Sequence, residues 1–174
     1  MILDGLLQFS GANGDSPTAT AVSTNVIDLH MAGIPILAAG QGARDIGIGD
    51  DPAMKLLVQV TVAFTGLTSL SVALQGAPDD GTGNPGTFVS WWAPASPTLL
   101  ASLTVGARLM DMDMPRPPAG VVEPRFLRLN YTIAGTGTGG TLKAFIVLDR
   151  HDQFYNTTNN AILGGYPPGV VVAN

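Results

Sequence analysis

The sequence predicts an all-β protein: a jelly-roll-like antiparallel β-sandwich of about eight strands, with long loops and little helix. Apolar residues alternate with polar ones over 56–64, 70–74, 127–133 and 142–148, which is the period of a strand with one buried face. Between such runs lie many of the 22 glycines and 13 prolines, the residues that tight turns favour. These observations together predict short strands joined by many turns.

The two clearest runs are each predicted to form a β-hairpin. In 55–75, Thr65-Gly66 interrupts the alternation and predicts a tight turn. In 126–149, the stretch IAGTGTGG at 133–140 lies between two amphipathic runs. A phosphate-binding glycine loop would have to open a helix, but TLKAFIVLD at 141–149 has the strand period, so these glycines are interpreted as a turn.

The remaining elements are shorter or more ambiguous. We expect a strand within 18–29 and another within 87–92. The segment 98–110 has period two, although Leu99, Leu103 and Met110 also fit a helical stripe. The chain of 174 residues is predicted to form one domain over 1–174, with 1–17 an arm and 153–174 a tail that are both candidates for extended structure.

Low charge is the most informative feature of the composition. Charged residues make up 12% of the chain, where about 25% is usual in a soluble domain. Wide neutral surfaces favour a subunit of an assembly. The net charge of −5 and the two lysines argue against a nucleic-acid partner, and no apolar run reaches the ~18 residues of a membrane helix. MILDGLLQFS at 1–10 has no basic region and is not expected to be a secretory signal.

Few residues suggest catalysis or metal binding. GDSP at 14–17 is similar to a hydrolase nucleophile block, but Ser16 lacks the downstream D-x-x-H and an α/β context, so a turn is expected. Asp28/His30 and Asp149/His151 could each present two metal ligands on one strand face, although polar residues at strand ends more often mark the exit into solvent. With no cysteine, a thiolate site is excluded. We therefore expect no catalytic residue, no cofactor and no metal site, and no enzymatic activity.

Trp91-Trp92 could form a sugar-stacking platform. Because neighbouring strand residues point to opposite faces, we expect one tryptophan to enter the core and the other to face outward as a protein contact. The candidate interface residues are Arg44, Asp45, Trp91, Trp92, Tyr155 and Tyr166.

Four blocks of the sequence resemble capsid cement (decoration) proteins of tailed bacteriophages, of the type found on a Bordetella podophage. They are LLQFS (6–10), ATAVSTNVIDL (19–29), ARDIGIGDDPAMKLLVQV (43–60) and GTGTGGTLKAFIVLD (135–149). The resemblance implies a jelly-roll virion protein that is made in the bacterial host cytoplasm and dimerises. It also implies that this protein binds the outside of the capsid and clamps neighbouring major capsid proteins.

Two other functional classes are compatible with the sequence. A carbohydrate- or receptor-binding module of a phage particle would need exposed aromatic residues in a groove. An esterase or metal enzyme would need Ser16, or His30 and His151, gathered in one pocket.

Overall fold

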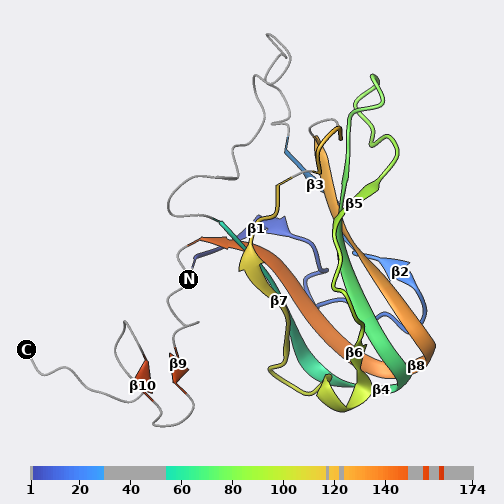
Figure 1. Ribbon diagram of the computed structural model, residues 1–174, viewed down its shortest axis with the longest axis vertical. Coiled ribbons are helices and arrows are strands. Elements are labelled where there is room, and N and C mark those ends of the chain that lie inside the picture. The colour runs from blue at the N-terminus through green and yellow to red at the C-terminus, as the bar shows by residue number, and fades with distance from the viewer. Residues whose placement is uncertain are drawn as a thin grey trace, which may run out of the picture.

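The structure is a computed structural model that describes residues 2–29, 54–116, 118–121, 124–148, 155–156 and 161–162. It confirms the all-β prediction: eight strands form one curled antiparallel sheet (Figure 1). The strands of this sheet are β1 (Ile2–Gln8), β2 (Ala21–Val22), β3 (Ile27–Asp28), β4 (Lys55–Ala77), β5 (Val89–Trp92), β6 (Thr98–Leu99), β7 (Arg108–Asp113) and β8 (Phe126–Leu148). Within the described residues the single helical element is a 3-10 turn, η1 (Leu100–Ser102), and β9 (Tyr155–Asn156) pairs with β10 (Ala161–Ile162) as a separate ladder.

The two 23-residue strands β4 and β8 are the backbone of the fold. They pair with each other from Lys55–Val147 at one end to Ala77–Phe126 at the other. Figure 1 shows this ribbon running down one side of the molecule, bending at the lower end and returning up the other side. The ribbon therefore contributes its two strands to both layers of the sandwich.

The shorter strands extend the ribbon on both edges. In the first layer, β2 and β3 pair with the first half of β8, while β5 and β6 pair with the second half of β4. In the second layer, β1 pairs with the second half of β8 and β7 with the first half of β4. Each layer is thus about four strands wide, as expected for a sandwich of this length.

The two predicted hairpins are wrong, because both glycine stretches lie inside continuous strands. Gly66 and the 135–140 stretch face each other where the ribbon bends, and the register shifts repeatedly between Val60 and Ser69. Such shifts are β-bulges, which bend and twist a strand pair without ending it. Gly140 has a φ of 119°, and a Cβ there would lie 2.4 Å from the Phe64 ring, so only glycine fits this part of the bend.

The core lies between the two layers and follows the predicted alternation. Leu56, Val58 and Val60 alternate inward from β4, and apart from Phe9 and Leu103 the largest fully buried side chains come from both halves of the ribbon. They are Tyr131, Phe9, Leu56, Leu70, Leu74, Leu103, Leu127, Leu129, Leu142, Ile146, Val58 and Val60. Val62, predicted on the same face, is 54% exposed because the bulges next to it interrupt the alternation.

Two further strand predictions are only partly correct. The segment 18–29 forms the two short strands β2 and β3 in place of one strand. The segment 98–110 divides into β6, η1 and the start of β7. On its predicted apolar face Leu103 is buried and two residues are half-buried, whereas Leu99, Ala101 and Val105 are exposed. This segment follows the outer edge of β4 around the bend, so neither a strand period nor a helical stripe describes it.

Candidate functional site

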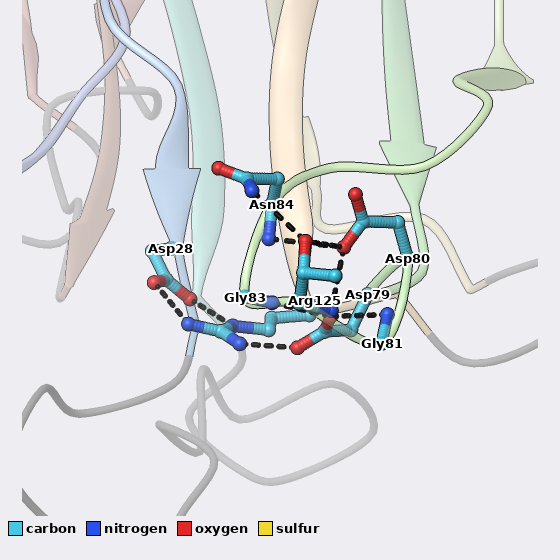
Figure 2. Close-up of polar contacts among 8 residues, drawn as sticks. Asp28, Asp79, Asp80, Gly81, Gly83, Asn84 and Arg125 are labelled. Atoms are coloured by element: carbon cyan, nitrogen blue, oxygen red, sulfur yellow. Dashed lines mark hydrogen bonds and ion pairs between the residues drawn. The ribbon is translucent and has the colours of Figure 1, made fainter.

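Arg125 joins the end of β3 to the 78–86 loop, at the end of the sandwich opposite the bend (Figure 2). It directly precedes β8, and its guanidinium lies between Asp28 of β3 and Asp79 of the 78–86 loop. Nε and Nη2 donate to the two oxygens of Asp28 at 2.9 Å each, and Nη1 donates to Asp79 Oδ2. The hydrogen bond to Asp28, followed by that to Asp79, raises the pKa of Arg125, which stays charged at any relevant pH.

The 78–86 loop is held by its own carboxylates. Asp79 Oδ1 accepts hydrogen bonds from the backbone N–H groups of Gly81 (2.7 Å) and Gly83 (3.0 Å). Asp80 Oδ1 accepts from the backbone N–H of Thr82 at 2.8 Å, from the Thr82 hydroxyl at 2.7 Å and from the Asn84 N–H at 3.3 Å. These are Asx-type turns, which fix the backbone without regular secondary structure.

The same contacts keep the loop negatively charged. Backbone hydrogen bonds from Gly83 and Gly81 lower the pKa of Asp79, and the hydrogen bond from the Thr82 hydroxyl lowers the pKa of Asp80. Asp80 is exposed, and no hydrogen bond from a described residue engages its other oxygen, Oδ2. Two carboxylates, Asp28 and Asp79, thus bind one guanidinium at this end, and Asp80 on the same loop adds an exposed third carboxylate, so that the end presents an ordered acidic surface.

A second polar cluster surrounds Asp15, beside Ser16. The Asp15 carboxylate is buried and accepts from the N–H of Gly11, from the N–H and hydroxyl of Thr24, and from the hydroxyl of Tyr131. A shallow pocket of about 210 Å³ lies against it, lined by Gly14–Pro17, Ala21, Val22, Thr24 and Tyr131. The Asp15 carboxylate already accepts four hydrogen bonds, which bind the 11–24 segment to β8. It therefore has little remaining capacity to accept a hydrogen bond from a ligand.

Ser16 lies at the rim of this pocket without a catalytic partner among the described residues. Its hydroxyl shares a 2.8 Å hydrogen bond with the Thr141 hydroxyl, and the neighbouring Asp15 is fully engaged. His30, Asp149 and His151 lie outside the described residues. Asp28 is bound by Arg125, and the described part of the chain contains no group of three potential metal-ligating side chains.

Both tryptophans pack against the core, contrary to the expected alternation. Trp91 is buried, and Trp92 is half-buried and also contacts the core cluster. The β4–β5 register shifts between Leu74 and Gln75, which makes Trp91 the extra residue of a bulge. A bulge turns two consecutive side chains toward the same face, so Trp91-Trp92 is not an exposed stacking platform.

The other candidate interface residues lie beyond what the structure describes. Arg44, Asp45 and Tyr166 are outside the described residues, and for Tyr155 only the backbone of β9 is described. Sequence reasoning missed Arg125, although two signals pointed to it. It follows Pro124 at the start of a strand, and it is one of eight basic residues in a chain with 13 acidic ones.

No helix in the described part of the chain is long and apolar enough to cross a membrane.

Comparisons with known proteins place the chain in a family. A comparison with curated proteins found no match. The family model Bbp16, whose name suggests a Bordetella phage protein, matches residues 11–146, which include every strand of the main sheet after β1 apart from the last two residues of β8. The chain therefore belongs to the Bbp16 family.

Proposed function

We propose that this protein is a structural component of a phage virion, located on the capsid surface. In this proposal it binds the outside of the assembled capsid as a homodimer and stabilises contacts between major capsid proteins. It carries out no reaction and uses no cofactor. Membership of the Bbp16 family supports the phage context, and the low charge and rigid β-scaffold support a role in assembly.

The observation that supports capsid attachment is the ordered acidic end, formed by Asp28, Asp79, Asp80 and Arg125. A protein that clamps a lattice needs contact groups whose positions are fixed before binding, because ordering a loop on contact reduces the affinity. Arg125 and Asp79 meet this requirement through the hydrogen bond between them, and backbone N–H groups of the 78–86 loop hold Asp79 and Asp80 (Figure 2). Fixed carboxylates at this end fit a basic patch on the capsid exterior.

Stabilisation of the shell follows from mass action. A protein that binds only the assembled lattice lowers the free energy of the lattice relative to its dissociated subunits. Many copies act on each shell, so a modest free energy per copy is sufficient. The protein itself needs only a stable fold and two kinds of contact, one to the capsid and one to its own copy.

The proposal is tested with capsids prepared without this protein. Purified wild-type protein is expected to co-sediment with the capsids and to raise the temperature at which they release DNA. Asp80→Asn keeps an oxygen that can accept the Thr82 hydrogen bonds but removes the negative charge, so it is expected to weaken co-sedimentation by about tenfold. Asp113→Asn is the matched control, since Asp113 is an exposed carboxylate at the end of β7, in the other layer of the sandwich, and pairs with Lys55 of β4. Wild-type protein that fails to bind capsids would refute the proposal, and binding to a glycan array would favour a receptor-binding module.

A further inference from the structure

The described segments that form the end of the sandwich at the ribbon bend contain no charged residue. Four segments meet there: 16–22, 60–70, 98–107 and 132–141. Hydrogen bonds join them, from Gly137 N–H to the Thr18 carbonyl, from Gly106 N–H to the Val60 carbonyl, and from Phe64 N–H to the Leu103 carbonyl. We call this surface the neutral end. Figure 1 shows the bend at the lower end of the main sheet, away from β3, which contributes Asp28 to the Arg125 cluster.

Large aliphatic side chains are exposed on the neutral end. Val105 is 66% exposed, Leu99 is 61% exposed and Val62 is 54% exposed, which places them among the four most exposed large hydrophobic residues described. Leu99 pairs with Ser69 of β4. Val105 lies in the 104–107 turn, which is hydrogen-bonded to Val60 of the same strand. Single exposed aliphatics are ordinary, but three around one uncharged bend provide apolar area that a partner can bury.

Four threonine hydroxyls of the neutral end already have partners within the chain. The Thr65 and Thr138 hydroxyls bond each other at 3.1 Å, and the Thr61 hydroxyl donates to the Thr141 carbonyl at 3.2 Å. The Thr20 hydroxyl accepts from the Ile133 N–H at 3.1 Å. Burying a hydroxyl that is already hydrogen-bonded avoids most of the desolvation cost, so these threonines can enter a contact as methyl-bearing, nearly apolar groups.

We propose that the neutral end is the surface through which two copies of this chain associate. Each copy carries a net charge of −5, so two copies repel each other unless their contact excludes the charged surfaces. The neutral end satisfies this condition, and a two-fold contact there sets the same surface of each copy against the other. This inference rests on the proposed function, since it assigns the dimer contact to one end and leaves the acidic end free for the capsid.

Arginine substitutions on the neutral end test this contact directly. Val105→Arg and Val62→Arg each place a pair of like charges in the proposed interface, and we expect the dimer dissociation constant to rise about 100-fold in sedimentation equilibrium. Val26→Arg is the matched control, because Val26 is an exposed valine next to β3, at the opposite end of the layer, and should leave the dimer intact. Circular dichroism and the melting temperature establish that each variant is folded.

A charge exchange separates a true contact from a general loss of stability. Val105→Glu should also give monomers, but an equimolar mixture of Val105→Arg and Val105→Glu should associate again, because a two-fold contact brings position 105 of one copy close to the same region of the other. Association of the wild-type protein should not weaken between about 50 and about 500 mM salt, because no ion pair takes part and added salt screens the repulsion between two negatively charged copies.

Each outcome bears on the inference. Loss of the dimer in the two neutral-end variants, with restoration in the mixture, supports it. A dimer that persists in both variants, or wild-type protein that stays monomeric at tens of micromolar concentration, would overturn it. Capsid co-sedimentation is measured separately with the same variants: neutral-end variants that remain dimeric but no longer bind capsids would show that this surface contacts the shell and would also overturn the inference.

Discussion

Tyr131 and Asp15 lie 116 residues apart in the sequence, and the Tyr131 hydroxyl donates a 2.7 Å hydrogen bond to Asp15 Oδ2. Both side chains are buried, so the contact fixes the 11–24 segment to the first half of β8. Burial, followed by the hydrogen bond to Asp15, raises the pKa of Tyr131, which therefore keeps its proton and remains a donor.

Removing this hydroxyl should destabilise the protein without changing its fold. Tyr131→Phe takes one of four donors from a buried carboxylate, and we expect the free energy of unfolding to fall by about 1–3 kcal/mol. Urea denaturation followed by tryptophan fluorescence measures the change. Asp15→Ala should cost more, because it leaves several donors without an acceptor. A Tyr131→Phe variant as stable as the wild type would show that the hydrogen bond contributes nothing.

The bend should tolerate no side chain at Gly140. Gly140→Ala adds a Cβ within 2.4 Å of the Phe64 ring at a φ of 119°, so we expect a loss of about 3 kcal/mol or failure to fold. Gly81→Ala is the control: its φ is also positive, at 91°, but nothing lies within 4 Å of the added carbon. Gly81→Ala should cost only about 1 kcal/mol. Equal losses in the two variants would contradict the close contact at the bend.

Arg125 should control the order of the acidic end more than the stability of the whole protein. Arg125→Lys keeps the positive charge but cannot bond both oxygens of Asp28 and Asp79 at once. Because these groups are partly exposed, we expect the unfolding free energy to change by about 1 kcal/mol or less. Hydrogen exchange of the 78–86 amides should accelerate severalfold, while exchange in β4 and β8 stays as in the wild type. Unchanged exchange in 78–86 would show that Arg125 does not hold this loop.

The acidic end should keep its structure well below neutral pH. Backbone hydrogen bonds lower the pKa of Asp79, and the Thr82 hydroxyl lowers the pKa of Asp80, both from 3.8. A carboxylate whose pKa is lower in the folded state stabilises that state above the unfolded pKa, and the contribution is lost as the pH falls through the folded pKa. Protection of the Gly81–Asn84 amides, corrected for intrinsic exchange rates, should therefore be constant from pH 8 to about 5 and decline only below 3.8. A decline near pH 6 would point to a different controlling group.

The alternation of apolar residues was enough to predict the fold class and most of the core. The predicted periodicity places on the buried face Leu56, Val58, Leu127 and Leu129, and all four are buried. The reason is that alternate side chains of a strand point to the same face of the sheet. The local pattern could not separate a turn from a bend. Gly66 and the 133–140 stretch have the composition of turns, and only the pairing of β4 with β8 along their whole length makes them a bend in a continuous ribbon.

The candidate site depended on contacts that no local pattern encodes. Arg125 meets Asp28 from 97 residues away and Asp79 from 46 residues away, and sequence spacing gives no sign of either pairing. The bulge that turns Trp91 inward was equally hidden, since a single extra residue in an edge strand leaves no periodic signal. The four segments of the neutral end contain no charged residue, but nothing in the sequence indicates that they meet.

The continuous β4–β8 ribbon also has a consequence for the order of folding. Its pairs join residues roughly 50 to 90 positions apart, and such non-local topology is typical of domains that fold in milliseconds to seconds. Among the pairs between β4 and β8, the one that closes the shortest loop is Ala77–Phe126. We therefore expect the pairing of these two strands to begin there and to proceed residue by residue toward the bend. The acidic end would then be the nucleus of the fold, and the neutral end would form late, when the chain is already committed to its topology.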